Sequence, residues 1–108
     1  MPFSVFLTDD ALRDLTEIRD YIAGRNGPER AAAVLDATEK RVQRLSAHPE
    51  RGRIPRELQE TGLRDFREIF FKPYRILYRI ADVRIYVLLV ADGRQDMQTL
   101  LQRRLLRD

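Results

Sequence analysis

FREIFFKPYRILYRIADVRIYVLLV, residues 66–90, is the stretch that decides the fold of this chain. It contains three short runs rich in β-branched and aromatic residues, at 67–72, 74–80 and 84–90. A tight turn at Ala81–Asp82 separates the last two runs. The spacing therefore predicts three consecutive strands of a small antiparallel sheet.

Two arginines lie within the middle run of this stretch. Successive side chains of a strand point to opposite faces of the sheet, so one face receives Arg75, Leu77 and Arg79. The opposite face receives four large apolar or aromatic side chains, Tyr74, Ile76, Tyr78 and Ile80. The third run is apolar on both faces, which is typical of a central strand. The pattern thus predicts two guanidinium groups on one face of the sheet.

Each of these guanidinium groups must stay hydrated or find a partner. Local carboxylates such as Glu68 or Asp96 could pair with them, which would make this a solvated sheet face. A guanidinium group can also hold a phosphate or a carboxylate of another molecule bidentately. We favour this second interpretation for Arg75 and for Arg94, which follows the neighbouring strand, and leave both interpretations open for Arg79.

The first half of the chain predicts a short strand followed by two helices. Residues 3–7 alternate weakly, and Thr8 is a suitable N-cap for a helix in which apolar residues recur every three or four positions. The GRNG sequence at 24–27 ends this helix. Pro28 suits the first turn of a second helix, which extends to about Ala47. The two helices form a predicted hairpin.

A loop and a final helix complete the predicted architecture. Residues 48–62 contain two prolines and two glycines without a sustained period, which indicates a long loop, and residues 95–106 predict a short helix. We expect an α+β fold, with a helical hairpin packed on a small antiparallel sheet in the order β-α-α-β-β-β and a short C-terminal helix. The hairpin would cover one face of the sheet. The other face, with Arg75 and Arg79, would be partly open.

Length and composition limit the classes of function. The 108 residues are 44% hydrophobic and 34% charged, which predicts one globular domain over residues 1–108. Twenty basic residues against 17 acidic ones give a net charge of +3, which is low for a dedicated nucleic-acid binder. No cysteine is present, so disulfides and cysteine nucleophiles are excluded. No apolar run approaches about 18 residues, and we expect a cytoplasmic protein that does not contact membranes.

The common catalytic and cofactor motifs are missing from the sequence. It has no GxxxxGK[ST] phosphate loop, no GxGxxG and no GxSxG elbow. The single histidine, His48, has no second histidine with which to form a metal pair, and we interpret it as a loop residue. We therefore expect neither a metal nor a cofactor.

Four segments together resemble the RelE/ParE toxin superfamily, the small toxins of bacterial type II toxin–antitoxin modules. These segments are LTDDALRDLTEIRDYIA at 7–23, HPERGRIP at 48–55, FREIFFKPYRILYRI at 66–80 and VRIYVLLVADGRQD at 83–96. They cover nearly the whole chain in the expected order. The resemblance implies a helical hairpin against a small antiparallel sheet and a cognate antitoxin that wraps around the toxin.

Two branches of this superfamily imply different activities. RelE-like members cleave messenger RNA on the ribosome without a metal. By resemblance, their strand arginine corresponds to Arg75, and their arginine after the last long strand corresponds to Arg94. The tyrosine expected a few residues later is missing, because MQTLLQ places Met97 and Leu100 there. The lysines of the preceding strand are missing as well, and Glu68 would bring negative charge close to a phosphate. Losing one positioned acid or base typically costs about 10²–10⁴ in rate.

The pattern therefore resembles the ParE branch more closely, whose members inhibit DNA gyrase by protein contact. On this interpretation the chain is not an enzyme, and a metal-independent ribonuclease using Arg75 and Arg94 is the alternative. The expected partners are a cognate antitoxin in a hetero-oligomer and DNA gyrase, with no direct binding of DNA by the toxin alone. The residues expected to bind the antitoxin or the target are Arg75, Leu77, Arg79, Arg94, Leu101, Arg103 and Arg104.

Overall fold

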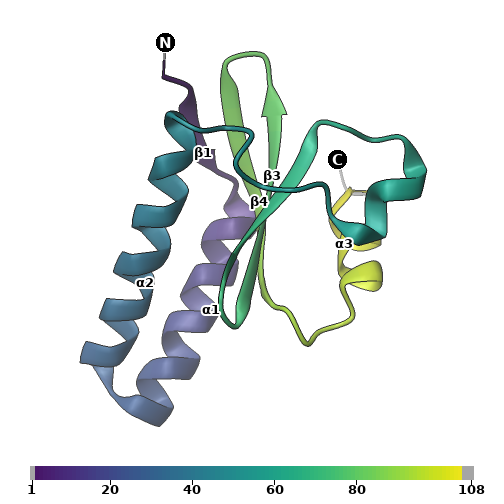
Figure 1. The fold of residues 1–108 in the computed structure, drawn as a ribbon. Coiled ribbons are helices and arrows are strands. Elements are labelled where there is room, and N and C mark those ends of the chain that lie inside the picture. The colour runs from purple at the N-terminus through teal and green to yellow at the C-terminus, as the bar shows by residue number, and fades with distance from the viewer. Residues whose placement is uncertain (1, 106–108) are drawn as a thin grey trace.

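The computed structural model describes residues 2–105 and confirms the predicted α+β fold (Figure 1). Two short 3₁₀ helices, η1 and η2, accompany the strands and α-helices. In chain order the elements are β1 (Ser4–Leu7), α1 (Asp9–Asn26), α2 (Pro28–Gln43), η1 (Arg44–Ser46), η2 (Arg56–Thr61), β2 (Phe66–Phe71), β3 (Tyr74–Ala81), β4 (Arg84–Asp92) and α3 (Met97–Leu105).

The four strands form one sheet in the order β1-β4-β3-β2. The two hairpins β2–β3 and β3–β4 are antiparallel, as predicted. β1 joins the sheet parallel to β4, with Val5 opposite Ile85, so the sheet is mixed and not wholly antiparallel. The helical hairpin between β1 and β2 makes this possible, because a parallel pair needs a long connection. β4 therefore has a neighbour on both sides. Its sequence is apolar on both faces because each face contributes side chains to a core cluster.

Local capping groups set the bounds of the helical hairpin. The Thr8 hydroxyl accepts a hydrogen bond from the Ala11 N–H at 3.2 Å and donates one to the Val87 carbonyl at 3.0 Å. Gly27, at φ 94°, separates the two helices, and Pro28 begins α2. The hairpin covers one face of the sheet (Figure 1). A core of buried residues joins them: Ala11, Val42, Leu45, Ile76, Tyr78, Ile85, Val87 and Val90.

The other face of the sheet is covered too, and the expectation of a partly open face at Arg75 was wrong. Residues 48–62 were expected to be a loop, but η2 lies within them. The segment with η2 and the helix α3 lie on this side of the sheet (Figure 1). Leu58 of η2 and Met97 and Leu101 of α3 are buried there. These side chains form a second core cluster with Leu77, Leu89 and Ala91. A single apolar residue of η2 and the spaced apolar residues of α3 are therefore enough to enclose the centre of the sheet.

A β-bulge in β4 adapts the strand to this second cluster. Leu77 lies opposite Leu89 and Tyr78 lies opposite Val87, so Leu88 has no partner on β3. Leu88 and Leu89 consequently both pack against the second cluster. Among the helices within residues 2–105, none is long and apolar enough to span a membrane.

The segment before η2 is tied to the sheet by Tyr78. The phenol group donates a hydrogen bond to the Pro49 carbonyl at 2.6 Å and accepts one from the Gly52 N–H at 3.0 Å. Burial raises the pKa of Tyr78, so the phenol stays protonated and able to donate. One residue further on, the backbone of Arg53 exchanges two hydrogen bonds with that of Glu68, at 3.0 and 2.7 Å. The segment thus lies on the edge of β2.

We expect Gly52→Ala to destabilise the protein by about 1–3 kcal/mol, because a Cβ there has no room. It would lie 2.5 Å from the Glu68 carbonyl oxygen and 2.8 Å from the Tyr78 hydroxyl oxygen. Urea unfolding measures the change. Gly24→Ala is the matched control, since its Cβ would meet no atom within 4 Å and helix propensity predicts a gain of up to about 1 kcal/mol. Equal effects of the two substitutions would contradict this packing.

Candidate functional site

Arg75, the strand arginine, lies in a buried ion network on the second face of the sheet. Its Nε donates to Glu68 Oε1 on β2 at 2.7 Å, and its Nη1 and Nη2 bond to the two carboxylate oxygens of Glu57 on η2 at 3.0 and 2.8 Å. The whole Arg75 residue is 7% exposed, and Glu68 is 1% exposed. The guanidinium group is therefore occupied by two carboxylates of its own chain.

The charges of this network balance only when a second arginine is included. Two carboxylates face Arg75, and Glu68 Oε2 has no hydrogen-bond partner within the described residues. The Nε of Arg53 lies 3.5 Å from this oxygen and supplies the second positive charge. The hydrogen bond from Arg75 lowers the pKa of Glu57 below its ordinary value, and the carboxylates, Glu57 first, raise the pKa of Arg75. Glu57 and Arg75 are accordingly both charged at neutral pH.

Arg79, two residues along β3, is exposed and paired more loosely. Its Nε donates to Asp65 at 2.8 Å, and its guanidinium carbon lies 5.8 Å from the centre of the Phe66 ring. The side chain is 50% exposed. An exposed ion pair of this kind typically contributes about 0–1 kcal/mol, so it leaves Arg79 available to another partner.

Arg94 lies just after β4 and pairs with Asp92 at the end of that strand. Its Nε and Nη2 donate to the two carboxylate oxygens of Asp92 at 2.9 and 2.7 Å, and its backbone N–H adds a third hydrogen bond. These bonds, the side-chain ones first, lower the pKa of Asp92 to about 2. The Arg94 side chain is 85% exposed, so the pair lies on the surface.

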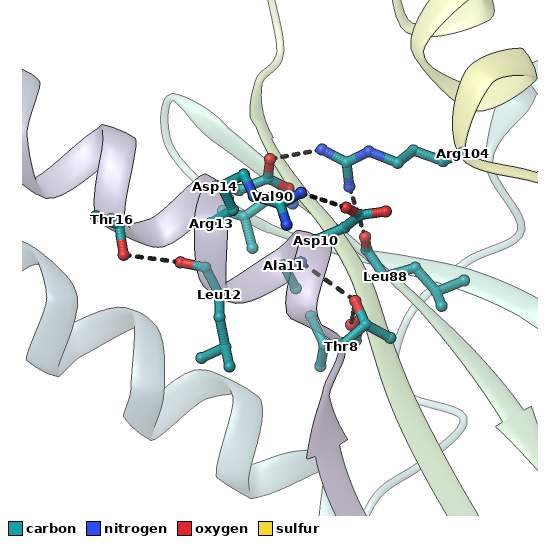
Figure 2. A network of polar contacts seen from close by, with 11 residues as sticks. Thr8, Asp10, Ala11, Leu12, Arg13, Asp14, Thr16, Leu88, Val90 and Arg104 are labelled. Atoms are coloured by element: carbon teal, nitrogen blue, oxygen red, sulfur yellow. Dashed lines mark hydrogen bonds and ion pairs between the residues drawn. The ribbon is translucent and has the colours of Figure 1, made fainter. Parts of the chain in front are cut away.

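The C-terminal helix α3 is fixed to α1 and β4 by Arg104. Figure 2 shows this guanidinium group between the Leu88 carbonyl and Asp14 of α1. The bond to the carbonyl is 2.7 Å long, and the other oxygen of Asp14 accepts the Val90 N–H at 2.9 Å. Asp14 thus connects a helix, a strand and α3, and Leu88 is the bulge residue of β4.

Six of the seven residues predicted for the site fall into two groups. Arg75, Leu77 and Leu101 are buried within the second face and present no side chain to a partner. Arg94, Arg103 and Arg104 line one depression of about 540 Å³ between α1, β4 and α3. Arg79 lies apart from it. The seven residues therefore do not form one continuous surface.

The sequence did not indicate Glu57 and Asp14 as partners of these arginines. Glu57 lies in the segment predicted as a loop, and Asp14 is one of many carboxylates on a predicted helix surface. Glu68, in contrast, was named as a possible partner of a strand arginine, and it is one. Among residues 2–105, no group of three or more His, Cys, Asp or Glu side chains is arranged to hold a metal ion.

We expect Arg75→Met to destabilise the protein by about 3–5 kcal/mol, because it leaves the Glu68 carboxylate buried without its partner. Adding Glu68→Leu should recover a large part of this loss. Arg79→Met is the matched control on the same strand, with an expected cost of at most about 1 kcal/mol. Urea unfolding measures all three variants, and similar losses for Arg75→Met and Arg79→Met would argue against a structural network.

We expect Arg94→Gln to raise the pKa of Asp92 from about 2 towards its ordinary value of 3.8. The pKa is lower in the folded than in the unfolded chain, so the ionised Asp92 stabilises the fold fully above about pH 4. This contribution is lost as the pH falls towards 2. Carboxyl carbon NMR shifts of Asp92 give the pKa directly. An unchanged value in the variant would show that Arg94 does not cause the shift.

Three comparisons relate this chain to known proteins. A family model described as "ParE toxin of type II toxin-antitoxin system, parDE" matches residues 5–97. The chain is 34% identical over 84 residues to Toxin ParE3 of Caulobacter vibrioides, across 78% of this chain and 80% of that toxin. The residues that the family model matches thus take in the helical hairpin and nearly all of the sheet.

Solved structures with a similar fold include members of both branches. A chain of the chromosomal ParDE system from P. aeruginosa has a TM-score of 0.70 at 22% identity, over 83% of this chain and 95% of that one. A chain of the RelBE2 toxin–antitoxin complex from Mycobacterium tuberculosis has a TM-score of 0.60 at 28% identity, over 85% and 92%. A free RelE mutant from E. coli has a TM-score of 0.68 at 16% identity, over 99% and 98%.

The fold is therefore common to RelE and ParE structures, while the family model and the sequence relative both point to ParE. The model covers most of the chain, and the relative exceeds 30% identity over more than two thirds of it. These findings bear out the superfamily predicted from the sequence segments. The chain belongs to the ParE toxin family of type II toxin–antitoxin systems.

Proposed function

We propose that this protein inhibits DNA gyrase by direct contact and that a cognate antitoxin neutralises it. The observation that carries this proposal is the saturation of Arg75 by Glu57 and Glu68. A RelE-like ribonuclease would need Arg75 at the phosphate. In this chain Arg75 instead forms ion pairs within the protein. Inhibition of a target protein by direct contact is consistent with membership of the ParE family.

The surroundings of Arg75 and Arg94 also disfavour cleavage of RNA. A phosphate approaching Arg75 would meet two carboxylates, and leaving them unpaired in a buried site is costly. Arg94 already holds both oxygens of Asp92. Arg75 is therefore withheld from a phosphate, and Arg94, although exposed, would bring the Asp92 carboxylate close to one. Stabilising charge on the phosphate is the main requirement of such catalysis.

The antitoxin of this proposal has a suitable binding surface on the helical hairpin. A groove of about 510 Å³ lies between α1 and α2 and is lined by apolar residues that include Leu12, Leu15 and Leu35. Leu12 is half exposed there. An amphipathic helix of the antitoxin would place its apolar face in this groove. Solved ParDE and RelBE2 relatives are toxin–antitoxin systems, which supports a partner of this class.

The exposed arginines near α3 are the proposed contacts to the target. Arg94 and Arg103 are exposed at the same depression, and Arg79 is exposed on β3. Arg75, Leu77, Leu101 and Arg104 support this surface from within, because they hold η2 and α3 on the sheet. In this proposal the toxin acts in the cytoplasm, binds gyrase and not DNA itself, and slows growth.

We expect the purified toxin to inhibit supercoiling by gyrase at micromolar concentration. Arg94→Gln/Arg103→Gln should raise the half-inhibitory concentration by about tenfold, as for residues that contribute strongly to an interface. Arg19→Gln/Arg30→Gln removes the same charge from the exposed surface of the helical hairpin and should have little effect.

Two results would contradict this proposal. The first is unimpaired supercoiling in the presence of the folded toxin. The second is codon-linked cleavage of messenger RNA after induction, detected by primer extension and abolished by Arg75→Ala or Arg94→Ala. The second result would assign the chain to the ribonuclease mechanism.

A further inference from the structure

A row of large side chains crosses the second face of the sheet at the end that η2 and α3 do not enclose. Phe6 of β1 lies opposite Tyr86 of β4. Tyr86 in turn lies opposite Arg79 of β3, and Arg79 lies opposite Phe66 of β2. Residues directly opposite each other in a sheet share one face, so the four side chains form one row across all four strands. We call these four residues the aromatic row.

The aromatic row is partly open to solvent, although the side chains next to it are buried. Leu77, two residues before Arg79 on the same face of β3, belongs to the buried second cluster. In the row itself, Phe6 is 46% exposed and the Arg79 side chain is 50% exposed. Tyr86 and Phe66 are only partly buried. Contiguous exposed apolar side chains mark interaction sites, whereas single ones are ordinary on protein surfaces.

The rings of the row contact their neighbours through their faces. The rings of Phe6 and Tyr86 are stacked, with their centroids 5.6 Å apart and their planes at 24°. The guanidinium carbon of Arg79 lies 5.8 Å from the centre of the Phe66 ring. Rings that stack across two neighbouring strands stand upright on the sheet and present their edges to solvent. A nucleic-acid base binds by stacking on a ring face, so this row is not built as a platform for bases.

The surface beside the row is positively charged. Arg84 precedes Tyr86 by two residues on β4, so it lies on the same face, and it is exposed. Within residues 2–105, Arg84 has no carboxylate partner. Arg79 has only its exposed pair with Asp65, which contributes little. This charge fits carboxylates of a partner, whereas an isologous contact between two copies would bring the arginines of both chains to one surface.

We propose that the aromatic row and Arg84 supply most of the affinity for the target, by binding an element of gyrase that combines aliphatic side chains with carboxylates. This inference rests on the proposed inhibition of gyrase. Exposed arginines at the rim of an interface mainly speed the encounter, while aromatic and arginine side chains near its centre supply most of the binding energy. Ring edges carry partial positive charge, so carboxylates would lie favourably beside them and bind Arg84.

Surface plasmon resonance with the full-length toxin and immobilised gyrase tests this proposal. Phe6→Thr removes the most exposed ring of the row and keeps a residue that favours strands. We expect the dissociation constant to rise at least about tenfold, mainly through faster dissociation, and the half-inhibitory concentration to rise equally. Phe70→Thr is the matched control, because Phe70 is 44% exposed on β2 and lies outside the row. It should keep the wild-type affinity.

A second variant, Arg84→Gln, tests the charge of the surface. We expect slower association with gyrase and a weaker dependence of the association rate on salt, because a charge that attracts the partner is lost. Arg30→Gln removes the same charge from the exposed surface of α2 and should change neither. Arg84 has no carboxylate partner within the described chain, so Arg84→Gln should fold normally and tests the surface independently of Phe6→Thr. Urea unfolding checks that both variants are folded.

Several outcomes would overturn the proposal. Unchanged binding to gyrase by both folded variants would refute it and leave the proposed function intact, as would an equal loss of affinity in Phe70→Thr. A wild-type dimer that becomes monomeric in Phe6→Thr, seen by sedimentation, would assign the row to a second copy. Binding of a labelled hexauridylate that Phe6→Thr abolishes would assign it to RNA. A wild-type toxin that neither binds nor inhibits gyrase would contradict the proposed function and this inference with it.

Discussion

The buried pairing of Arg75 with Glu57 and Glu68 is the interaction on which the second face of this protein depends. It joins β3, β2 and η2 through charged hydrogen bonds of 2.7–3.0 Å. Charges removed from water are costly, and the attraction between them offsets this cost only when the geometry is good and each group is satisfied. Arg53 completes the balance by approaching the remaining oxygen of Glu68. Removing Arg75 would leave the Glu68 carboxylate buried without its main partner.

This network also determines which arginines are available to other molecules. The guanidinium group of Arg75 is buried and paired with Glu57 and Glu68. A RelE-like mechanism would need this positive charge at the surface, where it could contact a phosphate. The segment that brings Glu57 to Arg75 also carries Gly52, which Tyr78 holds by its hydroxyl group. The same segment then places Arg51 and Arg53 beside the open edge of β2. The same segment therefore covers Arg75 and leaves Arg51 and Arg53 exposed.

Much of the architecture follows from local sequence patterns. The stripe of apolar residues between Leu12 and Ile22, the Gly27–Pro28 junction and the alternation in residues 74–80 predicted the helical hairpin and the strands correctly. These features depend on periods of 3.6 and 2 residues and on turn residues, which are visible in any short window. The ordered segments likewise indicated the superfamily that the comparisons confirm. Of the candidate site, the sequence identified the arginines and one of their partners, Glu68.

By itself, then, the sequence determined the order of the elements, the family and the set of arginines that could act. Only the tertiary structure decided which of those arginines remain exposed. Glu57 is 18 residues from Arg75, and Asp14 is 90 residues from Arg104. The parallel pairing of β1 with β4 and the enclosure of Leu77 by η2 and α3 also join residues that are not neighbours in the sequence. Such contacts leave no periodic pattern in the sequence, because they arise from how whole elements pack. An arginine that looks exposed on an isolated strand can therefore be neutralised by a carboxylate that folding brings to it.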